Sequence, residues 1–385
     1  MSDIVIAGIG QTAAGEHWDF SLRQLAYKAI KAAVVDSGGL KPQALFVGNM
    51  LSLNLSNQAH MGAFIADNAG LTGIEAVTIE AAGASGAAAL RQAYLAIQSG
   101  YVDTALVVGV EKFTDRVGSD VEAAVSTSMD SDYEGMQGLT STAQAAMIMR
   151  RYMHEYDVPQ SGFAGFAINA HANGAHNPNA MFQKAIKPET YARAEMVSEP
   201  VNMFDAAPNA DGAAALMLTR RDLLPAGFSQ PLVRIAGSAN STDTLALHDR
   251  HQMLAFQAAR IANTKALEKA GISLEQISFF EYHDAFSIFA ALSLEAAGFA
   301  EIGQGWKLAA DHAIHLNGKI PCGTMGGLKA RGFTGGASGV YQAVEAVQQL
   351  RANAGKNQVQ NARFGLIQSL GGPASTAVSH VLERI

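Results

Sequence analysis

Short apolar segments with strand propensity alternate with alanine-rich helical segments along two stretches of this chain, and this alternation constrains the fold more than any other feature. In the first stretch the pattern predicts strands at 3–9, 44–49, 76–81 and 103–110 and helices at 58–70 and 84–98. Another helix is expected after Ser21, because Ser21-Leu22-Arg23-Gln24 is a capping-box pattern followed by an apolar stripe. These elements indicate a layered α/β protein.

The second stretch begins near Leu232 and repeats this alternation. It predicts strands at 232–237, 277–282, 363–369 and 375–382 and helices at 251–271, from 284, and at 337–352. In each stretch a buried strand leads through a polar or glycine-rich turn into an alanine-rich helix, at Gly83 and at His283. We therefore expect two halves with one architecture.

The region between the two halves, residues 115–230, has a different character. It is richer in Met, Asn, His and Ser, and its periodicity is less regular. Polar breaks at 130–132 and the irregular stretch at 173–179 indicate excursions over a surface.

Composition limits the class of protein. A chain of 385 residues with 49% hydrophobic and 16% charged residues is long and apolar enough for a large core. Thirty-eight glycines beside ten prolines suit many tight turns and close backbone approaches. A net charge of −7 without a basic cluster argues against nucleic acid as a partner. The single cysteine, Cys322, excludes an intramolecular disulfide, and we expect a cytoplasmic protein without signal peptide or membrane span.

A series of short motifs follows in a fixed order along the chain. They are Gly8-Ile9-Gly10-Gln11-Thr12, Gly48-Asn49-Met50, Thr78-Ile79-Glu80-Ala81-Ala82-Gly83-Ala84-Ser85-Gly86, Ser99-Gly100-Tyr101-Val102-Asp103, Val108-Gly109-Val110-Glu111-Lys112, the segment 200–216, Glu281-Tyr282-His283-Asp284-Ala285-Phe286, Gly326-Gly327-Leu328-Lys329-Ala330-Arg331-Gly332 and Gly336-Ala337-Ser338-Gly339. In this order they resemble the thiolase superfamily, and the motif around His283 is similar to that of archaeal-type and sterol-carrier-protein-linked thiolases. Each motif is weak alone, whereas the ordered set covers nearly the whole chain.

The resemblance implies a fold and a set of partners. The expected fold is a duplicated five-layer α-β-α-β-α core with an inserted loop domain, divided into residues 1–115, 116–230 and 231–385. The expected substrate is an acyl-CoA thioester, as in the acetyl-CoA acetyltransferases of lipid metabolism. A homodimer or higher oligomer is expected, with an interface built from the strand at 103–110 and the segments beside Gly83, and with a small zinc-ribbon and OB-fold protein as a further partner.

Gly83 stands where the resemblance places the cysteine that forms the acyl-enzyme. Glycine has no side chain to be acylated, so covalent thiolase catalysis at this position is excluded. Two interpretations of Gly83 stay open. Its N–H at the start of a helix retains a site for a negatively charged oxygen, or the glycine only relieves a strained turn.

Phe333 is a second departure, because the family has a base histidine after its Gly-Gly-Leu segment, and phenylalanine cannot transfer a proton. His283 is the best candidate for a catalytic group, since the resemblance assigns it to an oxyanion hole; the alternative is a core histidine bonded to a carbonyl. Asp284 is expected to cap the helix that begins there. Ala285 and the turn with Gly371 and Gly372 stand at the two positions where the family has its second cysteine. Gly372 is expected to donate a backbone N–H to the pocket.

Three further side chains are candidates of lower weight. Cys322 could be a relocated thiol, although a lone cysteine is more often a buried apolar residue. Tyr282 and Tyr341 are of interest because thiolase-like aldolases of steroid side-chain degradation use tyrosine for proton transfer; the alternative is aromatic packing.

Other patterns do not support a function. The turn Gly8-Ile9-Gly10 lacks the third glycine of a dinucleotide fingerprint at its proper spacing. The pairs His171 and His176, and His248 and His251, have no evident third ligand, so no metal is expected. No Gly-x-Ser-x-Gly elbow surrounds Ser85 or Ser338.

Three hypotheses of function follow. The favoured one is a thiolase-like enzyme that binds acyl-CoA and makes or breaks a C–C bond without acylating itself, as a thiolase-derived aldolase would. The alternative is a non-catalytic subunit of a thiolase or of a complex with the zinc-ribbon and OB-fold partner. An ordinary acyltransferase would need Cys322 as its nucleophile.

Overall fold

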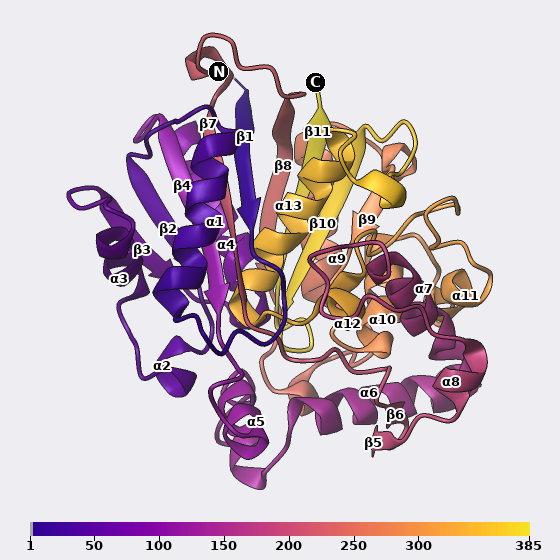
Figure 1. Cartoon of the computed structure of the whole chain (residues 1–385). Coiled ribbons are helices and arrows are strands. Elements are labelled where there is room, and N and C mark those ends of the chain that lie inside the picture. Colours follow the sequence, from indigo (N-terminus) through magenta and orange to yellow (C-terminus); the bar gives the residue numbers. More distant parts are fainter. Residues whose placement is uncertain (1–2) are drawn as a thin grey trace.

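The computed structural model describes residues 3–385, which form a mixed α/β protein around a nine-stranded sheet (Figure 1). The strands are β1 (Ile4–Gln11), β2 (Ala44–Gly48), β3 (Glu75–Ile79), β4 (Thr104–Glu111), β7 (Gly212–Arg220), β8 (Val233–Thr242), β9 (Phe279–Glu281), β10 (Phe364–Gly371) and β11 (Thr376–Arg384). Their order is β3-β2-β4-β7-β1-β8-β11-β10-β9. A separate short hairpin pairs β5 (Met196–Ser198) with β6 (Val201–Asn202).

Thirteen α-helices lie in the described part of the chain. They are α1 (Leu22–Asp36), α2 (Ser52–Leu55), α3 (Met61–Asn68), α4 (Ser85–Gln98), α5 (Gly118–Ser126), α6 (Ser141–Tyr156), α7 (Ala164–Gly174), α8 (Pro188–Ala192), α9 (Gln257–Ala270), α10 (Ser287–Ala297), α11 (Gly305–Ala310), α12 (Gly327–Arg331) and α13 (Ser338–Leu350).

The helices and the two halves of the sheet form five layers. Helix α1 packs on the outer face of the half that contains β1, β4 and β7, and α9 packs on the outer face of β8 and β11. Helices α4 and α13 lie between the halves and contact strands of both. The predicted five-layer α-β-α-β-α core is therefore confirmed. The two halves are joined at the centre by a short antiparallel contact in which Val5 pairs with Arg234.

Burial explains why the central elements form where they do. Every residue of β4 is buried, as expected for a strand with helices on both faces. Helix α13 is buried on nearly all sides, and glycine is required where it meets α4. A Cβ built on Gly339 would lie 2.4 Å from the backbone nitrogen of Ala87, so only glycine allows this approach.

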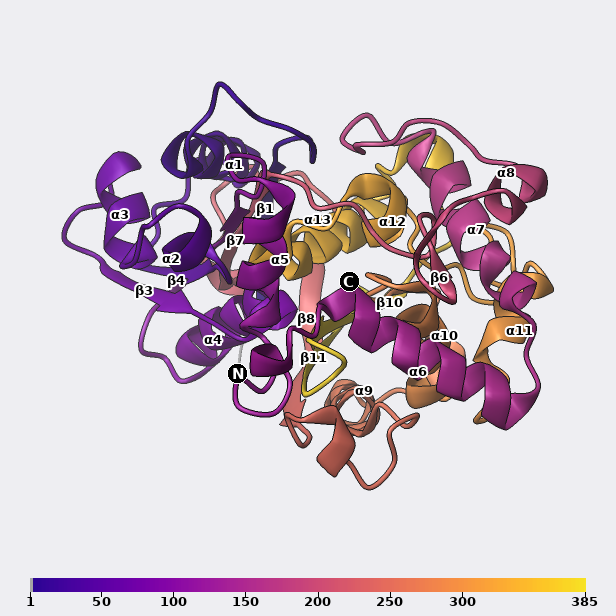
Figure 2. The ribbon, with the colours of Figure 1, turned by 90° about the horizontal axis from the view of Figure 1, so that it is seen from below.

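The segment between β4 and β7 leaves the sheet and carries helices α5 to α8. Figure 1 places α5, α6 and α8 toward the end of the molecule opposite the two termini, with α7 beside α11, and Figure 2 shows α5 and α6 in succession across that end. The division into 1–115, 116–230 and 231–385 stays a prediction; its middle part includes β7, which returns to the sheet between β4 and β1. No helix within 3–385 combines the length and apolar character needed to cross a membrane.

The expected dimer interface through the strand at 103–110 is wrong. This strand is β4, and it is hydrogen-bonded on both edges, to β2 and to β7. It therefore has no free edge for a second molecule. The open edge on this side of the described sheet belongs to β3, none of whose residues is buried.

We predict that Gly339→Ala destabilises the protein by about 1–3 kcal/mol or more, because the added methyl group meets backbone that cannot rotate away. Gly118→Ala is the matched control, since Gly118 begins α5 and no heavy atom lies within 4 Å of its built Cβ. The control should be neutral or slightly stabilising. Denaturant unfolding of the two variants measures both effects, and equal stability of the two would contradict the packing argument.

Candidate active site

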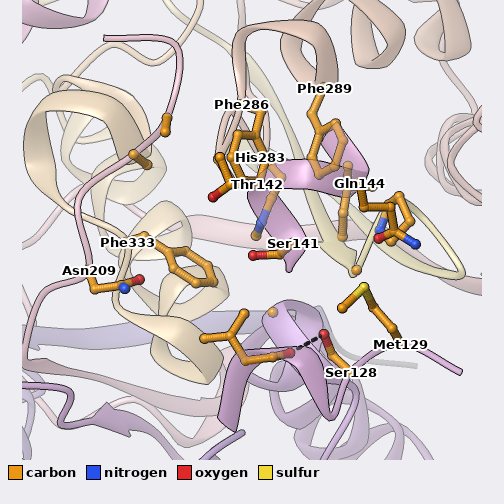
Figure 3. Close-up of a pocket in the computed structure, with 18 of the residues that line it drawn as sticks. Ser128, Met129, Ser141, Thr142, Gln144, Asn209, His283, Phe286, Phe289 and Phe333 are labelled. Carbon is orange, nitrogen blue, oxygen red and sulfur yellow. Dashed lines mark hydrogen bonds between the residues drawn. The ribbon is translucent and has the colours of Figure 1, made fainter. Parts of the chain in front are cut away.

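A cavity of about 90 Å³ opens where the two halves meet α5 and α6 (Figure 3). Its apolar lining includes Met50, Val125, Met129, Phe286, Phe289, Phe333, Leu370 and Pro373, and its polar lining includes Glu122, Ser128, Ser141, Thr142, Gln144, Asn209 and His283. Gly83 and Gly372 also line it. In Figure 3 His283, Phe286 and Phe289 lie across the cavity from Ser128 and Met129. The cavity thus brings together three predicted site residues, His283, Gly83 and Gly372.

Gly83 lies in a tight turn between β3 and α4. The turn is held by Ser85, whose hydroxyl donates to the Ala82 carbonyl at 2.6 Å and accepts from the Ala81 N–H at 2.9 Å. Ala82 has φ of 49°, a left-handed conformation that an alanine rarely adopts. Within residues 3–385 the Gly83 N–H has no hydrogen-bond acceptor. The turn therefore leaves a backbone donor free at the cavity wall.

Gly372 supplies a second backbone donor from the turn that joins β10 to β11. Its φ of 56° lies in the left-handed region, where glycine is the residue without strain. Its N–H also lacks an acceptor in the described chain. Two free N–H groups at one cavity form the kind of site that stabilises an oxyanion.

His283 is buried and neutral. Burial, with the nearby Arg331 guanidinium as a smaller cause, lowers the pKa of His283 to about 3. Its Nδ1 is shielded from solvent without a hydrogen-bond partner among residues 3–385. The other edge of the ring faces Gly83: a Cβ built on Gly83 would lie 3.0 Å from His283 Cε1 and 3.4 Å from Nε2. A neutral imidazole here can donate one hydrogen bond to a ligand, but it is not an acid at neutral pH.

A buried cluster of charges lies behind His283. Arg331 and Glu345 form an ion pair with 2.9 Å between Nε and Oε1, and Arg331 also stacks 4.8 Å from the centre of the Tyr341 ring. Glu281 accepts the N–H of Thr324 at 3.1 Å, and burial raises the pKa of Glu281 and of Glu345.

Asp284 also belongs to this cluster, and its predicted role needs correction. Its Oδ1 accepts the N–H of Leu328 at 2.7 Å, so it caps α12 rather than the helix that follows it in sequence. The carboxyl group occupies the space beside Gly327, where a built Cβ would lie 2.5 Å from Oδ2. The Gly326-Gly327 turn is therefore shaped around this carboxyl group.

Phe333 fills the cavity wall between the two halves. Its N–H donates to the Pro208 carbonyl at 2.7 Å, and its carbonyl accepts from Ala210 at 2.9 Å. The ring meets His283 edge to face, with 5.8 Å between centroids and an angle of 80°, and lies 6.0 Å from Phe113. An apolar ring thus covers the side of His283.

Cys322, Tyr282 and Tyr341 do not line the cavity. The Cys322 thiol is buried and donates to the Ile320 carbonyl at 3.2 Å, and burial raises its pKa well above the ordinary value. Tyr282 packs 5.6 Å from the ring of Phe280. The Tyr341 hydroxyl donates to the Thr12 carbonyl at 3.1 Å. These contacts are those of core residues.

Glu122, Phe286, Phe289 and Asn209 line the cavity, and the sequence analysis did not single them out for the site. Glu122 could have been found from the sequence. It follows Val121 and precedes Ala124 by two positions, which places a carboxylate beside the apolar face of α5. Residues 3–385 contain no group of three or more His, Cys, Asp or Glu side chains placed to hold a metal ion. His171 instead stacks on Phe182 at 5.8 Å.

Two family models together match most of the chain. A thiolase N-terminal domain model matches residues 4–222, and a thiolase C-terminal domain-like model matches residues 239–384. The chain belongs to the thiolase family.

Relatives of this thiolase-family protein differ in their named activities. The acetyl-CoA acetyltransferase of Methanothermobacter thermautotrophicus is 39% identical over 100% of both chains. The steroid side-chain-cleaving aldolase of Thermomonospora curvata is 26% identical over 90% of this chain and 91% of that protein. The solved structure of the Ltp2-ChsH2(DUF35) aldolase has a TM-score of 0.84 at 23% identity, covering 99% of this chain and 98% of that one, and shares its fold.

We predict that His283 makes the protein less stable as the pH falls. Because its folded pKa of about 3 lies below the ordinary value, the unfolded state binds a proton at pH 5 that the folded state does not. Between pH 7 and pH 5 this costs about 2 kcal/mol of unfolding free energy. His283→Gln should remove that part of the pH dependence, measured by denaturant unfolding at both pH values.

The comparison isolates His283 because other buried groups are common to both proteins. Glu111, whose pKa is raised to about 7 by burial, acts in the opposite direction and is unchanged. His248→Gln, at an exposed position, controls for the loss of a histidine as such. If wild type and His283→Gln show the same pH dependence, the histidine is not held neutral by the fold.

Proposed function

We propose that this protein binds an acyl-CoA thioester in the cavity and catalyses making or breaking of a C–C bond next to the thioester carbonyl, without forming an acyl-enzyme. The observation that carries the proposal is that three donors without partners, the N–H groups of Gly83 and Gly372 and the neutral His283, belong to residues that line one cavity, and that no cysteine lines it. Such donors stabilise the enolate oxygen of a thioester. An aldol or retro-aldol step needs that enolate and no covalent intermediate.

The relatives support a thioester substrate. One is named for transfer of an acetyl group from acetyl-CoA and another for aldol cleavage of a steroid side chain. Thiolase chemistry of the first kind requires a nucleophile, and neither Gly83 nor Phe333 offers a reactive side chain. The buried Cys322 offers no replacement, because its thiol faces the Ile320 carbonyl away from the cavity. The second kind of chemistry is compatible with the groups present.

The room above Gly83 gives a further reason against an acyl-enzyme. A Cβ at this position would lie 2.7 Å from the Leu370 carbonyl oxygen, which is backbone. A cysteine introduced here would have to displace β10 or the ring of His283. Such a cysteine would also lack a base, because the ring of Phe333 cannot accept the proton of its thiol.

The first test is calorimetric titration with coenzyme A and acetoacetyl-CoA, followed by a thiolysis assay and intact-mass analysis of the same sample. We predict binding with a micromolar Kd, no thiolysis, and no added acetyl mass on the protein. Thiolysis with a mass increase of one acetyl group would overturn the non-covalent mechanism. Absence of binding to any thioester would overturn the proposed function.

A second candidate is a non-catalytic subunit of a larger complex. The observation that favours it is the lack of a reactive side chain at both Gly83 and Phe333. The solved Ltp2-ChsH2(DUF35) aldolase is named for two components, which fits a protein of this fold acting together with a partner. A small zinc-ribbon and OB-fold protein is the partner that we propose. This candidate expects a stable complex and no turnover by either component.

We also propose that the protein is a homodimer whose two copies meet along β3. Strand β3 is an edge strand with unpaired backbone groups on its outer side, and Val77 is 37% exposed on it. Light scattering should give twice the chain mass for wild type and a lower mass for Val77→Lys. Val35→Lys makes the same change at an exposed site on α1 and should leave the dimer intact. A monomeric wild type at micromolar concentration would refute the proposal.

A further inference from the structure

Glu122 is the one acidic side chain in the lining of the cavity, and the donors described above leave its role open. It lies on α5, where Val121, Ala124 and Val125 are buried. Its Oε2 is shielded from solvent and has no hydrogen-bond partner among residues 3–385. A shielded carboxyl oxygen without a partner costs free energy, so its presence at a cavity calls for a ligand that completes it.

The surroundings of Glu122 raise the pKa of its carboxyl group. Burial raises its pKa from the ordinary value, and no charged side chain opposes that effect. Of the helices packed against α5, α2 has no ionisable residue, and the ionisable residues of α6 begin at Arg150, beyond the cavity-lining residues Ser141 to Gln144. His283 is the other ionisable group in the lining, and it stays neutral. A raised pKa makes a carboxylate a stronger base than an exposed one.

The lining also defines the acyl group. Phe286, Phe289, Met129 and Leu370 line the same cavity as Glu122 and His283. An apolar substituent is stabilised there by burial, whereas a charged one would lose hydration without a partner.

From these observations we propose that Glu122 is the acid–base catalytic residue of the cavity and that the substrate is a β-hydroxyacyl thioester with an apolar acyl chain. The proposal rests on the proposed function. The Glu122 carboxylate takes the proton of the β-hydroxyl group, the Cα–Cβ bond breaks, and the C–O bond becomes a carbonyl. The electron pair of the broken bond moves into the thioester as an enolate. Protonated Glu122 then returns the proton to Cα, so no other reactant is needed.

The last step can be measured in reverse. With 3-phenylpropanoyl-CoA in D₂O, Glu122 should remove a Cα proton and return deuterium, which mass spectrometry of the recovered thioester detects. Glu122→Gln keeps the shape and removes the base, and we expect exchange to slow by at least about 100-fold. Asp120→Asn makes the same change at an exposed site on the same helix and should exchange like wild type. The Kd of the thioester, measured by calorimetry, should be the same in all three proteins.

Each other outcome has a distinct meaning. Exchange in Glu122→Gln at the wild-type rate would overturn the assignment of Glu122 and leave the proposed function standing. Binding without exchange in wild type would also overturn it, because no proton is then removed from the acyl group. Absence of binding in wild type would overturn the proposed function and, with it, the role of Glu122. A pH profile of the exchange rate that keeps its acidic limb in Glu122→Gln would likewise contradict the assignment.

Discussion

The backbones of α4 and α13 touch at their N-terminal ends, and this contact fixes the geometry of the cavity. A Cβ on Gly86 would lie 2.7 Å from the Gly336 carbonyl oxygen, so the two helices meet without side chains between them. Gly83 precedes one helix and Phe333 precedes the other, and their separation follows from that contact. Glu111 at the end of β4 holds the turn before α13 next to the loop after β2, because its carboxyl group accepts the N–H groups of Met50 at 2.9 Å and Gly336 at 3.0 Å. A change in this packing would move both walls of the cavity together.

The contact also explains why a site of this kind keeps its backbone donors when side chains in it are substituted. The directions of the Gly83 and Gly372 N–H groups are set by the turn after β3 and the turn after β10, and any residue that preserves those turns preserves the donors. A nucleophile or a base, by contrast, is lost with one substitution. Polarisation of the thioester oxygen therefore depends on backbone N–H groups that the fold positions. Proton transfer depends on individual side chains such as Glu122.

The sequence predicted the core well because periodicity reports burial. The strand expected at 44–49 is β2 at Ala44–Gly48, and the helix expected at 84–98 is α4 at Ser85–Gln98. Helix α9 begins at Gln257 rather than 251, because the apolar residues before it pack against the core from a loop of turns and bends. Helices α6 and α7 were not predicted, since the faces that they bury depend on partners distant in sequence. Neither was the site role of Glu122, whose meaning arises only when α5 reaches the cavity.

Motif resemblance predicted site roles for His283 and for its neighbour Tyr282, and of the two only His283 lines the cavity. Consecutive residues of an extended segment point to opposite sides, so Tyr282 enters the core when His283 faces Gly83. Tyr341 does not line the cavity either; its hydroxyl donates to the Thr12 carbonyl, and its ring lies against Arg331. Physical direction of each side chain, rather than sequence proximity, decides which aromatic residues a ligand can meet.

The buried charges behind the motif determine which proton chemistry is open to the cavity. Arg331 adds to the effect of burial in keeping His283 neutral. Burial also raises the pKa of Glu345 and Glu281. A histidine held neutral in this way can orient a carbonyl oxygen but has no proton to give away at neutral pH without becoming an anion. Proton transfer therefore has to come from a group outside the field of Arg331, and α5 supplies the side of the cavity from which it can come.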